Sequence, residues 1–219
     1  MINKDYILRL AERFGRQLAI ILRLRKFDQN EEALIYIDDL LLKSTGFTSR
    51  FLNSLSEEML LQILSPLGNL NIEAALWSAM LLKAEGEIYE AMGQTNESYH
   101  RYIKSLSLWL EILRHENITA EPEFAQAITD LIKQLDDYEL PQNIKDKLFA
   151  YYEHIGNYGK AEDVLFELLE ANPSDSWLIE RGEAFYDRLL SKGNADLLAG
   201  NLSREEAEEG LAQLKQMHR

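Results

Sequence analysis

The side chains that could carry chemistry in this sequence are few and scattered. Cysteine is absent, which excludes a thiolate nucleophile, a cysteine zinc site and a disulfide framework. Glu97 and His100 have the Glu-x-x-His spacing of di-iron bundles, but such sites need a second copy of the pair and the sequence has none. His115 is followed by glutamate as in a zincin helix, yet Thr119 stands where the second histidine belongs. We therefore expect no metal, no cofactor and no catalytic residue.

Other catalytic motifs are also missing from the sequence. It has no Gly-x-Ser-x-Gly elbow, no Ser-x-x-Lys motif, no phosphate-binding glycine loop and no calcium loop. These absences favour a protein that is not an enzyme. One enzymatic alternative stays open, because a pair of buried carboxylates in a helical bundle leaves no sequence motif.

The charge is strongly acidic overall but unevenly distributed. The formal net charge is −14, whereas residues 1–26 carry seven Lys or Arg against two acidic residues. Four arginines of this segment fall within about 80° of one helix face, opposite its apolar face; they are Arg9, Arg13, Arg16 and Arg23. We consider three roles for this stripe: solvated surface, nucleic-acid binding, and docking on an acidic face of the same chain or of a second copy. The acidic remainder of the chain argues against nucleic acid.

Helical signals account for nearly the whole chain. Apolar residues spaced by three and four predict a long amphipathic helix from Asp5 to Phe27. Valine occurs once, at Val164, and strand-like runs are absent, so we expect an all-α protein. Capping and breaking residues predict further helices at about 30–43, from the Ser54-x-x-Glu57 box to residue 66, at 71–92, from 95, from Pro122, from Pro141, at 158–171, at 177–190 and from the Ser203-x-x-Glu206 box. Residues 191–202 are expected to form a loop.

The best internal boundary lies at residues 65–71, where Pro66 and Gly68 interrupt the helices. We expect an N-terminal segment over 1–70, with a long basic amphipathic helix plus a hairpin, and a repeat region over 71–219, together forming one continuous unit. Charges near the N-terminus break up any signal-peptide core, and no apolar run approaches the ~20 residues of a bilayer span. We therefore expect a cytoplasmic protein without membrane contact.

Residues 145–173 carry the clearest repeat signal. The pattern consists of Leu148-Phe149, Tyr152, Gly156, Tyr158, Ala161, Leu165, Leu168 and Asn172-Pro173. It resembles the tetratricopeptide repeat, with Phe149 in place of the usual small residue. Weaker copies surround Ala33, Ser98 and Ala207, so the anchors are spaced by 65, 63 and 46 residues rather than by 34. We expect irregular antiparallel helical hairpins in a short solenoid or bundle. The opening segment Asn3–Arg9 also resembles the start of an uncharacterised family of small bacterial proteins.

The tetratricopeptide resemblance implies a scaffold that holds a peptide or partner helix on the surface lined by the first helix of each pair. Small residues such as Gly86 and Ala161 would let the paired helices approach closely between aromatic neighbours. The repeat frame places nine residues on this groove: Lys83, Glu87, Glu90, Asp146, Glu153, His154, Glu183, Tyr186 and Asp187. Their acidic character favours a basic partner, and the alternative is an ordinary solvated face.

The sequence thus favours a non-catalytic helical-repeat scaffold that mediates protein–protein interaction, including pairing with a second copy as a homodimer. The first alternative is a small-molecule-binding regulatory domain, with a pocket between Trp77, Tyr89 and Tyr102; a filled core at that place would dismiss it. The second alternative is the enzyme with buried carboxylates. Nucleic acid and membranes are not expected partners.

Overall fold

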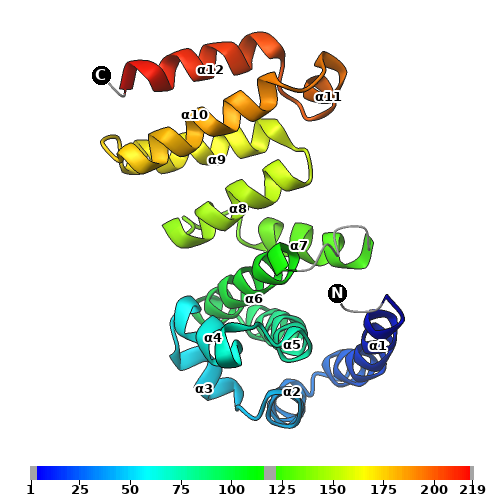
Figure 1. Ribbon diagram of the computed structural model, residues 1–219. Helices are drawn as coiled ribbons and strands as arrows, with labels where there is room; N and C mark the ends of the chain where they lie inside the picture. The colour runs from blue at the N-terminus through cyan, green and yellow to red at the C-terminus, as the bar shows by residue number, and fades with distance from the viewer. Residues whose placement is uncertain (1–3, 116–121, 218–219) are drawn as a thin grey trace. The chain divides into compact units, whose positions relative to one another are not determined.

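The computed structural model describes the backbone of residues 4–115 and 122–217, and the side chains of residues 12–114 and 125–217. Within these ranges the chain forms twelve α-helices and one short 3-10 helix and contains no β-strand (Figure 1). The protein is therefore all-α, as the sequence predicted. None of the described helices combines the length and the apolar character needed to cross a membrane.

The chain divides into two compact units, Met1–Glu139 and Leu140–Arg219. This division differs from the sequence-based partition near residue 70, because helices from both sides of that point pack together, above all α2 with α5. The first unit contains α1 (Lys4–Lys26), α2 (Asn30–Thr45), α3 (Ser49–Ser54), α4 (Glu57–Ile63), the 3-10 helix η1 (Pro66–Gly68), α5 (Ile72–Ala91), α6 (Thr95–His115) and α7 (Pro122–Gln134).

The centre of the first unit is the hairpin of α5 and α6, which pack on each other along their lengths. The Asn71 side chain caps α5 by accepting a hydrogen bond from the Ala74 amide at 3.1 Å. Gly93 follows α5 with a φ of 73°, a left-handed conformation that glycine adopts without strain. The hairpin is closely packed because Gly86 lies directly against the ring of Tyr102. Helices α1 and α2 then pack against α5.

One capping prediction in the first unit was wrong. Ser54 does not begin a helix; it is the last residue of α3. The cap of α4 is Ser56, whose side chain accepts a hydrogen bond from the Met59 amide at 3.2 Å. Ser54 has the glutamate of a capping box at the third following position, whereas Ser56 has Met59 there, so local spacing favoured the wrong serine.

The second unit contains α8 (Gln142–His154), α9 (Tyr158–Ala171), α10 (Ser176–Leu190), α11 (Asn194–Ala199) and α12 (Arg204–Met217). Helix α8 packs on α9, and α10 packs on α12. Ala161 is completely buried, and Gly182 leaves room for the side chains of Leu165 and Leu214. Small residues thus permit close helix contacts in this unit as well.

Two predictions for the end of the second unit had different outcomes. The Ser203 capping box is confirmed: the Ser203 amide donates to Glu206 Oε2 at 2.7 Å, and the Glu206 amide donates to Ser203 Oγ at 3.1 Å. The predicted loop over 191–202 was wrong, because α11 forms within it. Leu197 of α11 is fully buried, so tertiary packing stabilises a helix too short for a local signal.

Candidate functional site

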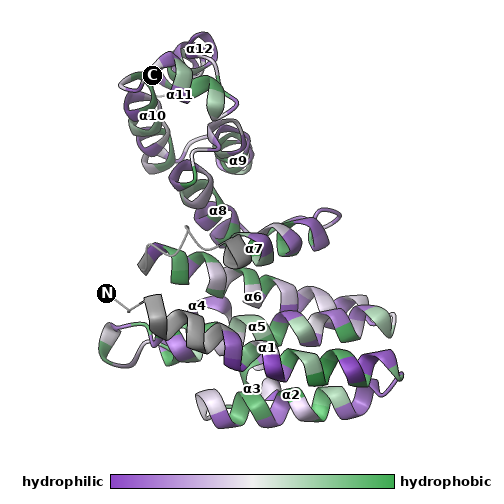
Figure 2. Cartoon of the chain, turned by 90° about the vertical axis from the view of Figure 1, so that its right-hand side faces the viewer, coloured by the Kyte–Doolittle hydropathy of each residue, from purple (hydrophilic) through white to green (hydrophobic). Residues whose placement is uncertain are grey.

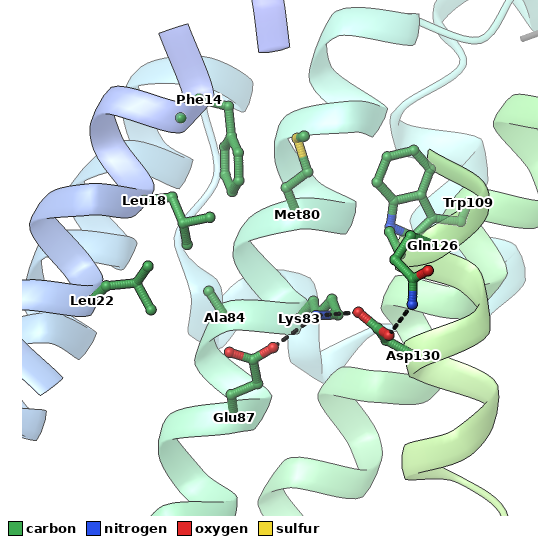
Figure 3. A pocket seen from close by; sticks show the side chains of 12 residues that line it. Phe14, Leu18, Leu22, Met80, Lys83, Ala84, Glu87, Trp109, Gln126 and Asp130 are labelled. Carbon is green, nitrogen blue, oxygen red and sulfur yellow. Dashed lines mark hydrogen bonds and ion pairs between the residues drawn. The ribbon is translucent and has the colours of Figure 1, made fainter. Parts of the chain in front are cut away.

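An apolar cleft in the first unit is the best candidate for a binding site. It has a volume of about 430 Å³ and lies between α1, α5, α6 and α7 (Figure 3). We call it the α1/α5/α7 cleft, and its lining residues are Phe14, Gly15, Leu18, Leu22, Met80, Lys83, Ala84, Glu87, Trp109, Gln126, Ala127 and Asp130. The apolar side chains make it suitable for a hydrophobic occupant.

Helix α1 forms one wall of the cleft through its apolar face. Phe14, Leu18 and Leu22 are spaced by four residues and therefore lie along one side of the helix (Figure 3). Phe14 anchors this wall, since its ring meets Trp77 edge-on with 5.7 Å between the centroids. Leu22 is 49% exposed, so the cleft is open to solvent beside it.

A chain of alternating charges runs from α1 over α5 to α7. Lys83 Nζ lies 2.8 Å from Glu87 Oε1 and 3.7 Å from Asp130 Oδ2 (Figure 3). Glu87 also pairs with Arg25 of α1, with 2.7 Å between Oε2 and Nη1. Gln126 Nε2 donates to Asp130 Oδ1 at 2.7 Å. Because two cations alternate with two anions, these charges neutralise one another and do not call for a charged occupant.

The predicted acidic groove residues fall into the two separate units, and several have internal partners. In the first unit, Lys83 and Glu87 line the cleft, and Glu90 accepts a hydrogen bond from the Tyr102 hydroxyl at 2.7 Å. In the second unit, Asp146 pairs with Arg181 at 2.7 Å, and Glu153 accepts two bonds from Arg188 at 2.7 and 2.9 Å.

The remaining groove residues all belong to the second unit and differ in exposure. His154 and Asp187 are exposed, and Glu183 is half-buried. Tyr186 is completely buried, and its hydroxyl donates to Glu162 Oε1 at 2.6 Å. Tyr186 therefore does not line a surface, because the helix face predicted for the groove is here covered by the unit's own core.

The predicted arginine stripe lies on α1, where its members have different surroundings. Arg9 lies outside the residues whose side chains are described. Arg13 pairs with Glu73 at 3.4 Å, and its guanidinium lies 5.6 Å from the centroid of the Trp77 ring. Arg16 and Arg23 are exposed. Arg13 thus pairs with an acid of the same chain, and so does Arg25, which the stripe did not include.

The place proposed for a small-molecule pocket is filled by side chains. Trp77 and Tyr102 are 3% and 2% exposed and belong to the packed core. Neither residue lines the α1/α5/α7 cleft or the cavity described next, although Tyr89 lines the latter. Trp77 and Tyr102 therefore serve packing rather than a pocket.

A second cavity, of about 670 Å³, lies between α2, α3, α5 and α6 in the same unit. We call it the polar cavity. Its lining is Leu34, Ile35, Asp38, Asp39, Ser49, Arg50, Asn53, Ser54, Glu85, Tyr89, Glu97, His100 and Arg101. No group of three or more His, Asp or Glu among the described residues is arranged to hold a metal ion.

Glu85 is the buried centre of the polar cavity. The Ser49 hydroxyl lies 2.6 and 2.7 Å from its two oxygens, and Arg101 Nε lies 3.4 Å away. Burial raises the pKa of Glu85 above its ordinary value, while the charge of Arg101 opposes this rise. Arg101 in turn stacks on Tyr89, at 4.3 Å from the ring centroid, and pairs with Glu97. The network links α3, α5 and α6.

The sequence indicates a buried carboxylate only as a general alternative and does not single out Glu85. A glutamate among apolar residues of a helix has no motif, and its partner Arg101 lies on another helix. Asp38, whose charge also raises the pKa of Glu85, accepts a hydrogen bond from the Ser49 amide at 2.6 Å and so is itself engaged. The described contacts of Glu85 are those of a network that fixes helices together.

Comparison with known protein families identifies the family of this chain. Residues 1–219 match the model of a family of unknown function, DUF6483. No curated protein and no solved structure matches the chain.

Proposed function

The chain belongs to the family DUF6483, and we propose from its geometry that it is a non-catalytic scaffold that binds a segment of another protein in the α1/α5/α7 cleft. The occupant is an amphipathic helix that inserts apolar side chains between α1 and α7. Recognition of this kind uses anchors spaced by three and four residues along the partner helix.

The observation that carries this proposal is an apolar cleft that stays open to solvent and has neutralised charges. Small-molecule sites commonly bury most of the surface of their ligand, whereas Leu22 leaves this cleft open on the side of α1. The alternating charges of Arg25, Glu87, Lys83 and Asp130 leave shape and apolar contact as the main determinants of binding.

We also propose that the helices follow a tetratricopeptide-like arrangement of irregular antiparallel hairpins. The contacts of α5 with α6 and of α8 with α9 support this proposal, since each pair is consecutive in sequence. The tight contact at Gly86 and the burial of Ala161 support it further. A chain without cysteine is suited to a reducing compartment, and we propose the cytoplasm.

The test fills the cleft with a large side chain and compares this variant with a matched substitution outside the cleft on the same helix. Ala127 lines the cleft, and Thr129 is exposed outside its lining. Tagged wild-type chain, Ala127→Trp and Thr129→Trp are used to retain proteins from native lysate, and circular dichroism checks that all three fold. We expect a retained protein that Thr129→Trp still binds and that Ala127→Trp binds at least tenfold less. Equal retention by all three forms would contradict the proposal.

A second candidate function is favoured by the size of the cleft. Its volume of about 430 Å³ lies within the range of small-molecule sites. The masses measured by native mass spectrometry separate the two functions. A bound small molecule that wild type and Thr129→Trp carry and Ala127→Trp lacks would replace the protein segment as the occupant.

A further inference from the structure

The outward face of α1 combines basic and apolar side chains. Arg16, Ile20, Arg23 and Phe27 follow one another at intervals of three and four residues, opposite the face that packs on the unit. Ile20 and Phe27 are 43% and 64% exposed. Neither Arg16 nor Arg23 makes an ion pair within the part of the chain that the structure describes. This face has no partner of its own among the described residues.

The outward face of α2 combines acidic and apolar side chains. Its exposed residues are Glu31, Glu32, Ile35, Asp39 and Leu42, all within about 100° of arc at 100° per residue. Ile35 and Leu42 are 66% and 48% exposed. Each face therefore exposes two large apolar side chains, and the charged residues of the two faces have opposite signs.

Helices α1 and α2 lie side by side, and a short connection at residues 27–29 makes them antiparallel (Figure 2). The Tyr36 hydroxyl of α2 donates to Gln17 of α1, which sets these two residues at the same level. To within two residues, or ~3 Å of helix rise, this register also sets Arg16 level with Asp39, and Ile20 level with Ile35. Arg23 is then level with Glu32.

We propose that these two faces form an interface with a second copy of this chain, α1 of each copy packing against α2 of the other. Two-fold symmetry produces both contacts at once. With the symmetry axis along the helices, each residue of α1 meets the α2 residue that shares its level. Arg16 then faces Asp39, Ile20 faces Ile35, and Arg23 faces Glu32 of the other copy.

The match of charge and level along the helices favours a second copy over an unrelated partner. Glu12 and Lys43, which are exposed further along α1 and α2, are also level and opposite in charge. Four of the fourteen large apolar side chains that the described structure exposes lie on these two faces, namely Ile20, Phe27, Ile35 and Leu42. Exposed apolar side chains gathered on one surface are typical of an interaction site, and the complementary charges fix the register.

The experiment uses two variants, each of which reverses the sign of the charges on one of the two faces. Variant one is Arg16→Glu with Arg23→Glu, and variant two is Glu32→Arg with Asp39→Arg. Lys133→Glu with Lys215→Glu makes the same change in net charge as variant one at exposed sites elsewhere. Each chain is measured by light scattering coupled to size-exclusion chromatography at low and high salt, and mixtures are measured by native mass spectrometry.

We expect the wild type and the control to be dimers that weaken at high salt, because salt screens charge pairs. Each face variant alone should be monomeric, since like charges then meet. An equimolar mixture of the two should form a dimer with one copy of each, which also demonstrates that both variants fold.

A wild-type monomer at every concentration overturns the second copy as occupant, and the basic face of α1 would then fit an acidic segment of another protein. Face variants that stay dimeric alone, or that fail to pair when mixed, also overturn the interface. The cleft variant Ala127→Trp leaves these faces unchanged, so it should dimerise as the wild type does, whatever it binds.

Discussion

The ring of Tyr102 in α6 occupies the space that a β-carbon on Gly86 in α5 would need. An ideal β-carbon at residue 86 would lie 2.6 Å from Cε1 and 2.7 Å from Cδ1 of that ring. The ring is also held at its far end, because the Tyr102 hydroxyl donates to Glu90 at 2.7 Å. A ring held in this way cannot move aside without losing a contact. Residue 86 therefore favours glycine although glycine is a poor helix former.

We expect Gly86→Ala to lower the free energy of unfolding by up to about 2 kcal/mol, because inserting a methyl group into a packed core usually costs about 1–3 kcal/mol. The gain in helix propensity, about 1 kcal/mol, offsets only part of this strain. Urea denaturation followed by far-UV circular dichroism measures the difference. A variant at least as stable as the wild type would contradict the close contact.

Gly15→Ala is the matched control, because Gly15 is also helical but has no atom within 4 Å of an added β-carbon. Here the propensity gain is unopposed, and we expect a rise in stability of up to about 1 kcal/mol. The same denaturation experiment applies. Opposite signs for the two glycines would separate packing from propensity.

Local sequence signals predicted much of the fold and little of the cleft. Caps such as Asn71 and Ser203 act within one turn, so their geometry is already present in the sequence. The close packing at Gly86 and the burial of Ala161 also agreed with prediction, since small residues between aromatics leave a readable pattern. The cleft depends on which helix faces which, and no short-range spacing contains that information.

The ion pair between Arg25 and Glu87 illustrates what sequence reasoning missed. The two residues lie 62 positions apart, and Arg25 falls on the apolar face of its helix, outside the predicted stripe. That face packs against α5, which brings the guanidinium to a carboxylate on the neighbouring helix. An arginine on an apolar face has a partner that only the tertiary structure reveals.

We expect Arg25→Met to lower the free energy of unfolding by about 1 kcal/mol, because it leaves the half-buried Glu87 with Lys83 alone. Amide hydrogen exchange should quicken in α1 and stay unchanged in α12. Lys26→Met, at an exposed neighbour, is the control and should change stability by less than about 0.5 kcal/mol. Equal effects of the two substitutions would show that the ion pair does not hold α1.

In the second unit we expect Tyr186→Phe to cost about 1–2 kcal/mol. The buried hydroxyl donates to Glu162 at 2.6 Å, and its loss leaves a carboxylate short of a donor. Burial raises the pKa of Glu162 and the bond from Tyr186 lowers it, so the variant should raise this pKa further. Hydrogen exchange in α9 and α10 reports the loss. Tyr138→Phe, at a 38% exposed tyrosine, is the control and should have little effect.

Glu85→Gln tests the buried carboxylate through the pH dependence of stability. Burial raises the folded-state pKa of Glu85, against the opposing charge of Arg101, so the folded chain holds this proton at pH values where the unfolded chain has lost it. Stability from this group is therefore greatest below the ordinary pKa of 4.5 and falls as the pH rises through the folded-state pKa. Glutamine keeps an oxygen for the Ser49 hydroxyl but does not titrate.

Urea denaturation from about pH 4 to about pH 8 measures this difference. The stability of the wild type should decline relative to that of Glu85→Gln, by at most about 1.4 kcal/mol per pH unit. Other groups titrate alike in both chains and cancel in the difference. A difference that is constant, or that grows with pH in favour of the wild type, would mean that the partners of Glu85 outweigh its burial.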